Sequence, residues 1–269
     1  MQRFSMPLLS VNYRWLNQLA NGLAVLAVIA IVTSALLWLA RLPYFVVDTV
    51  KIEGVNNEAL VYVTPDAVHA TIAGQLKGNF FSINLDESRA LLEKAPWVRR
   101  AQVRRVWPNT LQVKIEEQQP LAYWNESDMI NTWGEPFAAN EAVIVEGTFL
   151  PQLRGPANSE RLVVQRYAEV TQWLTPLGVS IQQLNLSPRY AWEVVLSDGI
   201  RLQLGRDPAA DIADLHGTSG AIDFAARLER FVQAWPTLHE RLDGRTIQSA
   251  DLRYSNGFAI SLAPLKPTE

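Results

Sequence analysis

The longest apolar run in the chain covers residues 22–40, GLAVLAVIAIVTSALLWLA, which holds no charged residue and only two hydroxyl side chains. As an α-helix rising about 1.5 Å per residue, this run reaches roughly 28 Å, close to the thickness of a bilayer's hydrocarbon core. Amphipathic aromatic rings, which favour the headgroup region, flank the run at Tyr13, Trp15, Trp38 and Tyr44. The pattern predicts one membrane-spanning helix.

Two other interpretations of the run are weaker. A cleaved signal peptide has an apolar core of about 7–15 residues followed by a small-residue cleavage site. Here the apolar core is longer, and residues 36–39 continue it past the small residues around Ala35. A core helix of a soluble protein is the other alternative, and it rarely has such an uninterrupted apolar sequence. We therefore expect an uncleaved span.

The charges beside the span give its expected orientation. Arg3 and Arg14 precede it without any acidic residue, whereas Arg41 and Lys51 follow it, so the count of basic residues is equal on the two sides. The α-amino group and the acid-free tail favour a cytoplasmic segment over residues 1–21. We expect the remainder of the chain to lie on the outer side of the membrane.

Residues 45–118 show a change of hydrophobic period that predicts the order β-α-α-β-β. Residues 45–55 alternate at period two, as a half-buried strand does. Helix start signals follow at Thr64-Pro65 and at Asn84 with Glu87 three residues later. Two strand-like runs, VRRAQVRRVW and TLQVKIEE, then meet at a turn signal, Trp107-Pro108-Asn109.

The pattern of residues 119–265 predicts a second domain, rich in β-structure, with mostly antiparallel strands and two helices. Asn158 or Ser159 can begin one helix, and a second apolar helical pattern over residues 222–238 is kinked or divided at Pro236. The pair Asp198-Gly199 indicates a hairpin between two alternating runs. The last expected strands are 246–254 and 257–262, before a tail at 266–269. The fold class is thus α+β.

Composition narrows the classes of function. The chain has 269 residues, with 27 Asp and Glu against 24 Lys and Arg and no cysteine. A mildly acidic chain argues against general nucleic-acid binding, which needs a basic surface. The four arginines at 99, 100, 104 and 105 suggest such binding locally, but a strand whose arginines are solvated or paired with acids explains them better. The absence of cysteine excludes disulfides and thiol catalysis and suits the periplasm.

Catalytic motifs are incomplete in this sequence. Residues 216–220, HGTSG, lack the residue that must separate the nucleophile from the second glycine of a hydrolase elbow. His239-Glu240 begins a zincin pattern, but position 243 is Asp rather than the second histidine. The chain contains three histidines in all. We therefore expect no enzyme activity, no metal, no cofactor and no small-molecule substrate.

Residues 78–124, GNFFSINLDESRALLEKAPWVRRAQVRRVWPNTLQVKIEEQQPLAYW, resemble the POTRA module of the FtsQ/DivIB family of bacterial division proteins. The likeness rests on Phe80-Phe81, Pro96-Trp97-Val98 and Arg105-Val106-Trp107-Pro108, and it extends from the span to Leu265. It implies a POTRA domain at 45–118 and a non-enzymatic protein that brings division proteins together at the septum. In this family the module docks upstream partners such as FtsK. The alternative is a POTRA-bearing component of a transport or secretion assembly, which often has several copies of the module.

The same resemblance implies a binding site at the last two strands, which in the family accept FtsB, itself paired with FtsL, by β-augmentation. Tyr254 would be a rigid anchor, and Arg189 would face an acidic residue of the partner, with Arg253 as a second charge. The expected partner-binding residues are Arg189, Arg253, Tyr254, Asn256, Gly257, Phe258, Ala259 and Ile260. The family usually has serine at the position of Asn256. If the N–H of Ala259 points towards the partner, proline there weakens binding. The alternative for these residues is a closed, ordinary hairpin.

Overall fold

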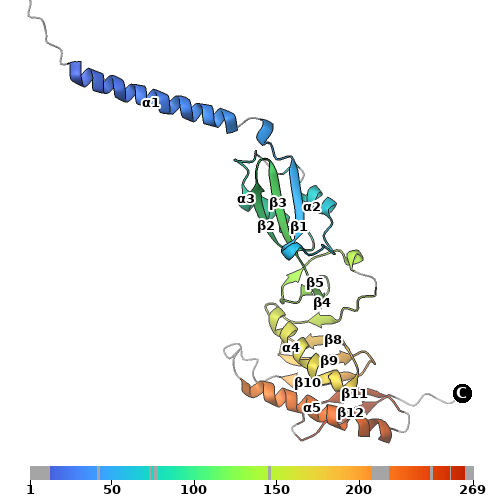
Figure 1. Ribbon diagram of the computed structural model, residues 1–269. Coiled ribbons are helices and arrows are strands. Elements are labelled where there is room, and N and C mark those ends of the chain that lie inside the picture. Colours follow the sequence, from blue (N-terminus) through green and yellow to red (C-terminus); the bar gives the residue numbers. More distant parts are fainter. Residues whose placement is uncertain are drawn as a thin grey trace, which may run out of the picture. The chain divides into compact units, whose positions relative to one another are not determined.

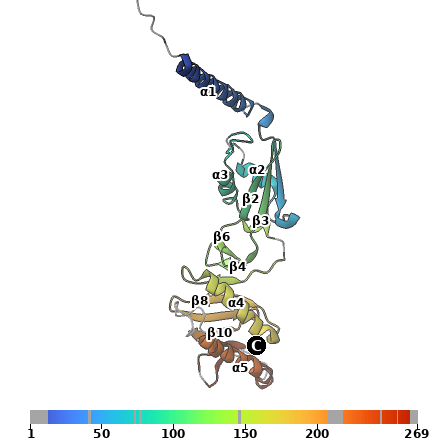
Figure 2. The ribbon, with the colours of Figure 1, turned by 60° about the vertical axis from the view of Figure 1, so that its left-hand side comes forward.

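The computed structural model describes residues 13–40, 43–72, 74–75, 78–144, 147–206, 218–242, 245–254 and 256–263. They form two compact units, residues 1–60 with 64–116 and residues 61–63 with 117–269, shown from two sides in Figures 1 and 2. Three predicted features lie outside the described residues: most of the cytoplasmic tail, the tail at 266–269, and the loop containing His216.

The predicted span is part of a longer helix, α1 (Tyr13–Ala40). The segment Arg14–Leu39 contains an 18-residue window of mean hydropathy 2.5 and is long and apolar enough to cross a membrane. The side chains described along this helix are exposed, as expected of a helix whose surroundings are lipid and not protein.

Beyond α1, the first unit has the predicted order β-α-α-β-β, and from here on we use first unit for this part alone. Its elements are η1 (Pro43–Phe45), β1 (Thr49–Gly54), η2 (Val55–Asn57), α2 (Pro65–Ile72), α3 (Leu85–Leu92), β2 (Val98–Val106) and β3 (Thr110–Glu117). The sheet order is β1-β3-β2, and β1 runs parallel to β3 with Thr49 opposite Thr110. The first strand begins later than position 45, because Pro43–Phe45 form a 3₁₀ turn. Asn84 caps α3 by accepting hydrogen bonds from the backbone N–H groups of Asp86 and Glu87.

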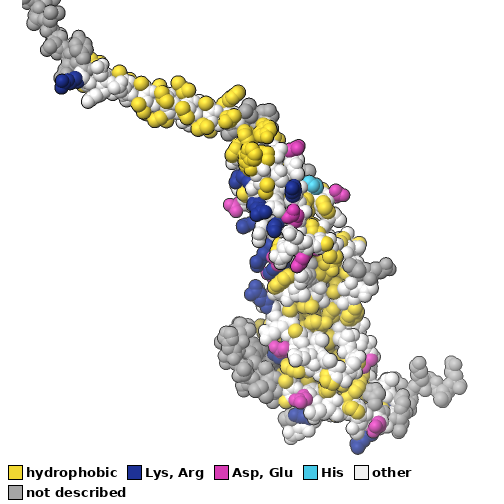
Figure 3. Space-filling model, viewed as in Figure 1, with side chains coloured by type: hydrophobic (Ala, Val, Ile, Leu, Met, Phe, Trp, Pro, Cys, Tyr) yellow, Lys and Arg dark blue, Asp and Glu magenta, His cyan; other side chains and the backbone are white. Residues whose placement is uncertain are grey.

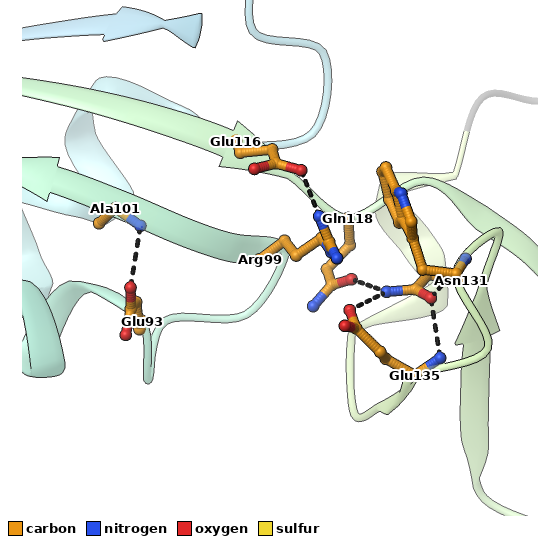
Figure 4. Close-up of polar contacts among 8 residues, drawn as sticks. Glu93, Arg99, Ala101, Glu116, Gln118, Asn131 and Glu135 are labelled. Atoms are coloured by element: carbon orange, nitrogen blue, oxygen red, sulfur yellow. Dashed lines mark hydrogen bonds and ion pairs between the residues drawn. The ribbon is translucent and has the colours of Figure 1, made fainter.

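The arginines of β2 stabilise the first unit itself. Arg99 is buried and pairs with Glu116 of β3 (Figure 4). Arg105 donates to the backbone oxygens of Phe80 and Ile83, each at 2.6 Å, and so ties the end of β2 to the loop before α3. These contacts support the structural interpretation of the basic run over the nucleic-acid alternative.

The second unit contains a mixed nine-stranded sheet. Its strands are β4 (Pro120–Trp124), β5 (Asp128–Asn131), β6 (Pro136–Phe137), β7 (Gln152–Arg154), β8 (Ile181–Leu186), β9 (Ala191–Leu196), β10 (Arg201–Arg206), β11 (Ile247–Asp251) and β12 (Ala259–Leu262). The order is β12-β11-β10-β9-β8-β7-β4-β5-β6. Most neighbours are antiparallel, as predicted. The parallel pairs are β4–β7, β7–β8 and β10–β11, the last two joined through a helix.

Two long helices, α4 (Glu160–Leu174) and α5 (Thr218–Arg241), cover one face of this sheet, with the short η3 (Glu141–Val143) and η4 (Thr175–Leu177) between strands and helices. The helix α5 continues through Pro236, so of the two outcomes predicted there, a kink or a division, the division is excluded. Buried side chains of alternate strand positions and of both helices form one core, which includes Leu184, Trp192, Val194, Leu202, Phe224, Phe231 and Ala250. The opposite face carries polar side chains such as Gln183, Glu193 and Gln203.

A buried asparagine organises the turn between β5 and β6 (Figure 4). The Asn131 side-chain amide donates to the side-chain oxygens of Gln118 at 2.8 Å and Glu135 at 2.9 Å. Its carbonyl oxygen accepts from the backbone N–H groups of Trp133 and Glu135. Because Asn131 is fully buried, these four hydrogen bonds satisfy groups that would otherwise be costly to remove from water.

Candidate functional site: the free edge of the large sheet

The strand β12 forms one end of the nine-stranded sheet. It pairs antiparallel with β11, placing Ala259 opposite Asp251 and Ile260 opposite Ala250. The sheet order gives it no strand neighbour on its other side among the described residues. The expectation of an edge strand is therefore confirmed, and such an edge presents backbone groups to a further strand.

The register of β12 decides which residues face that open side. Leu252 donates its N–H to Gln203 of β10 at 2.9 Å, and Ala263 donates its N–H to Thr246, before β11, at 2.9 Å. Because successive N–H groups of a strand point in opposite directions, Ala259 turns its N–H and C=O towards β11 and Ile260 turns its own to the open side. Ile260 and Leu262, and not Ala259, are thus the β12 residues whose backbone can pair with a partner strand.

The side chains of β12 divide between the core and the solvent. Phe258, just before the strand, packs its ring edge-on against Phe231 of α5 with 5.5 Å between ring centres. Ile260 and Leu262 also pack against the core, whereas Ala259 is exposed. The site residues Phe258 and Ile260 therefore hold the strand on the domain, and a partner would meet mainly their backbone.

An aromatic side chain stands beside the edge. Tyr254 is 57% exposed, and with Asn256, Gly257, Phe258 and Ala259 it lines an open hollow of about 460 Å³. Its phenol ring can cover apolar atoms of a bound segment while the hydroxyl remains hydrated. The structure thus groups five of the predicted partner-binding residues on one surface.

Arg253 presents its charge in a fixed direction. Its guanidinium donates to both carboxylate oxygens of Asp251, at 2.8 and 2.6 Å. This contact lowers the pKa of the Asp251 carboxyl, mainly through the hydrogen bond from Arg253. The side-chain stem lies over Gly205, where a Cβ would come within 2.9 Å of the Arg253 Cγ. Gly205 has a φ of +78° at an irregularity of the β9–β10 pairing, a conformation that glycine adopts easily.

Arg189 lies near the same strand ends as Arg253, where β9 begins and β10 and β11 end. It is exposed in the turn between β8 and β9, and the first residue of β9, Ala191, pairs with the last residue of β10, Arg206. Because β10 and β11 are parallel, the end of β10 is also the end of β11 from which Arg253 follows. A hollow of about 200 Å³, lined among others by Ser187, Gly205 and Arg253, lies between the turn and Arg253.

Sequence reasoning missed two residues that shape this site. Asp251 determines where the Arg253 guanidinium points, and Gly205 leaves room for the Arg253 stem. A glycine within a strand pattern is a signal of a bulge or of a close approach, so Gly205 could have been suspected. The Asp251–Arg253 contact has no comparable sequence signal, since an i, i+2 spacing is compatible with many loop geometries.

No group of three or more acidic, histidine or cysteine side chains that could hold a metal ion occurs among the described residues. At this site the described residues present a backbone edge, an exposed aromatic ring and two arginines, which are groups that can bind another chain.

Comparisons with known proteins match both units. The chain matches the family model "POTRA domain, FtsQ-type" over residues 45–118 and the model "Cell division protein FtsQ/DivIB, C-terminal" over residues 122–253. It is 54% identical to "Cell division protein FtsQ" of Bordetella pertussis over 94% of this chain and 93% of that protein. Proteins of the same name from Burkholderia pseudomallei (38% identical; 95% of each chain) and Nitrosospira multiformis (36%; 92% of this chain and 97% of the relative) are also similar.

Proposed function

The chain belongs to the FtsQ/DivIB family of cell division proteins, and we propose that it assembles division proteins at the septum by binding FtsB, with FtsL, along β12. In this proposal the protein is not an enzyme. Its N-terminus is cytoplasmic and both folded units are periplasmic, while the FtsQ-type POTRA domain receives other partners, FtsK among them.

The observation that carries the proposal is the free edge of β12. Ile260 points its backbone N–H and C=O away from β11, and β11 and the core hold the strand in an extended form. A partner strand that adds here gains backbone hydrogen bonds without first having to order the receiving strand. Exposed Tyr254 and Arg253 beside the edge supply the side-chain contacts that backbone pairing lacks.

The arginines indicate the charge of the partner segment. Arg253 already has one carboxylate partner, Asp251, but its side chain remains 59% exposed and can meet a second carboxylate. Arg189 is exposed near the same strand ends as Arg253. Two exposed cations at the strand ends from which Arg253 follows favour a partner with acidic residues there, which fixes the direction in which its strand adds.

The experiment that tests this proposal compares two replacements of one residue. Ile260→Pro removes the outward N–H from an edge position that tolerates proline, whereas Ile260→Ala removes similar side-chain packing and keeps the N–H. Purified periplasmic parts carrying each change should be titrated with the periplasmic segment of FtsB and melted in parallel. We expect Ile260→Pro to bind at least tenfold more weakly than Ile260→Ala, equivalent to about 1.4 kcal/mol, with melting temperatures within a few degrees of each other.

Equal affinities of the two variants would refute strand addition at β12. A third variant, Ala259→Pro, checks the assigned register. Because the Ala259 N–H faces β11, proline there should lower the melting temperature more than Ile260→Pro does.

A further inference from the structure

Five exposed apolar side chains gather at one end of the first unit. They come from three segments of the chain and are between 37% and 71% exposed: Tyr44, Val46, Phe81, Val106 and Trp107. We call them the end patch. Figure 3 shows apolar side chains at the end of this unit where the chain enters it from α1. A contiguous set of exposed aromatic rings on a soluble unit marks a surface that meets another apolar phase.

Backbone contacts hold the three segments of the end patch together. Phe80 donates its N–H to the carbonyl of Phe45 at 2.8 Å, which joins the loop before α3 to η1. Asp48 donates its N–H to the carbonyl of Asn109 at 3.2 Å, which joins the start of β1 to the turn between β2 and β3. The patch is therefore built by the fold.

Edge-on ring contacts hold two of the exposed rings, Tyr44 and Phe81, in place. The ring of Phe81 lies 5.0 Å from that of Phe45, and Phe45 lies 5.4 Å from Tyr44, both edge-on. Phe81 also contacts Phe80, which is buried, at 5.3 Å. A ring that is already fixed loses little conformational freedom when it is covered, so such a patch binds at a low entropic cost.

The connection to α1 identifies what covers the patch. The apolar helix ends at Ala40, and Tyr44 follows four residues later, a length of chain that spans at most about 14 Å. This end of the first unit is thus confined close to the bilayer surface by covalent linkage. Tyr and Trp are also the residues enriched where a membrane meets water, because their rings suit the headgroup region.

We propose that the end patch lies in the lipid headgroup region of the leaflet from which the chain emerges. The first unit is then attached to the membrane twice, through α1 and through a surface assembled from residues 44–46, 81 and 106–107. The second attachment fixes which side of the unit faces the bilayer. The partner is a phospholipid surface, and this inference does not depend on the proposed binding at β12.

The test uses the absence of cysteine, which allows single thiols to be introduced at chosen sites. Trp107→Cys and Val106→Cys place a thiol in the end patch, distant in sequence from the span. The matched control, Ala59→Cys, places one at an exposed position beyond the other end of β1. Each full-length variant is labelled with a bimane dye and inserted as one copy per nanodisc of phosphatidylethanolamine and phosphatidylglycerol.

Quenching of the dye then reports its surroundings. A nitroxide on the lipid headgroup should quench the label at positions 106 and 107 severalfold more than at position 59, and aqueous iodide should give the opposite order. If all three labels respond alike, the end patch faces water and the proposal is wrong. If shielding from iodide appears only in nanodiscs holding two copies, the patch binds a second chain and the membrane proposal is equally wrong. The two patch variants check one another if Trp107→Cys does not fold.

Discussion

Replacement of Tyr254 by alanine tests whether side chains beside β12, and not only its backbone, contribute to the proposed binding. Aromatic residues bury about 150–250 Å² when fully covered, and Tyr254 is 57% exposed, so a partner can cover roughly 110 Å² more. At about 25 cal/mol per Å², covering that area is worth up to about 2.8 kcal/mol. The usual loss at a central aromatic anchor is about 2 kcal/mol or more. We therefore expect FtsB binding to weaken by roughly thirtyfold to a hundredfold.

The fold should tolerate this change. The Tyr254 side chain lies beside the open hollow and not in the core cluster, so the free energy of unfolding should change by less than about 1 kcal/mol. A matched control is Phe149→Ala, because Phe149 is 59% exposed in the same unit but precedes β7, away from the β12 edge. Its affinity should stay within about twofold of the parent.

Isothermal titration with the FtsB segment, together with thermal melts of the same samples, measures both quantities. If folded Tyr254→Ala binds the FtsB segment as tightly as the parent does, Tyr254 is not part of the binding site. An equal loss in Phe149→Ala would show that the partner covers exposed aromatic surface without preference for the edge.

Three further changes test other parts of the structure. Arg189→Glu should weaken FtsB binding at least tenfold in a titration, whereas Arg154→Glu, with the same change of charge on β7, should leave it nearly unaltered. The contact from Arg253 lowers the pKa of Asp251, so the contact stabilises the fold above the ordinary carboxyl range, and this stabilisation is lost as the pH falls through the lowered pKa. In Arg253→Gln the pKa of Asp251 should rise back towards the ordinary range, which an NMR titration of the carboxyl group measures. Asn131→Asp places a carboxylate against two side-chain oxygens in a buried turn and should destabilise the second unit by more than about 2 kcal/mol in a denaturant melt, unlike Asn158→Asp at an exposed position.

Local signals in the sequence predicted the span, the elements of the first unit and most of those of the second, but not β7 and β8. The uncharged run at 22–40 predicted the span, and Asn84 predicted the start of α3 through a cap that involves its immediate neighbours. Such features depend on residues that are close together in the sequence. The same is true of the Asp198-Gly199 hairpin between β9 and β10.

Features that depend on distant residues could not be predicted in this way. The outward direction of the Ile260 backbone follows from the pairing of β11 with both β10 and β12, and β10 is separated from β11 by the whole of α5. The end patch likewise joins residues more than sixty positions apart, and each of its segments alone resembles an ordinary core strand or turn.

The two ends of the large sheet differ in a way that bears on stoichiometry. At one end β12 has no further strand beside it in the described part of the chain. At the other end β6 consists of Pro136 and Phe137 alone, and proline has no N–H to offer a further strand. A nine-stranded sheet with one edge open to pairing can accept one further strand. Such a unit can terminate a growing assembly but cannot propagate it, so added strands should stop at one per sheet even when the protein is crowded.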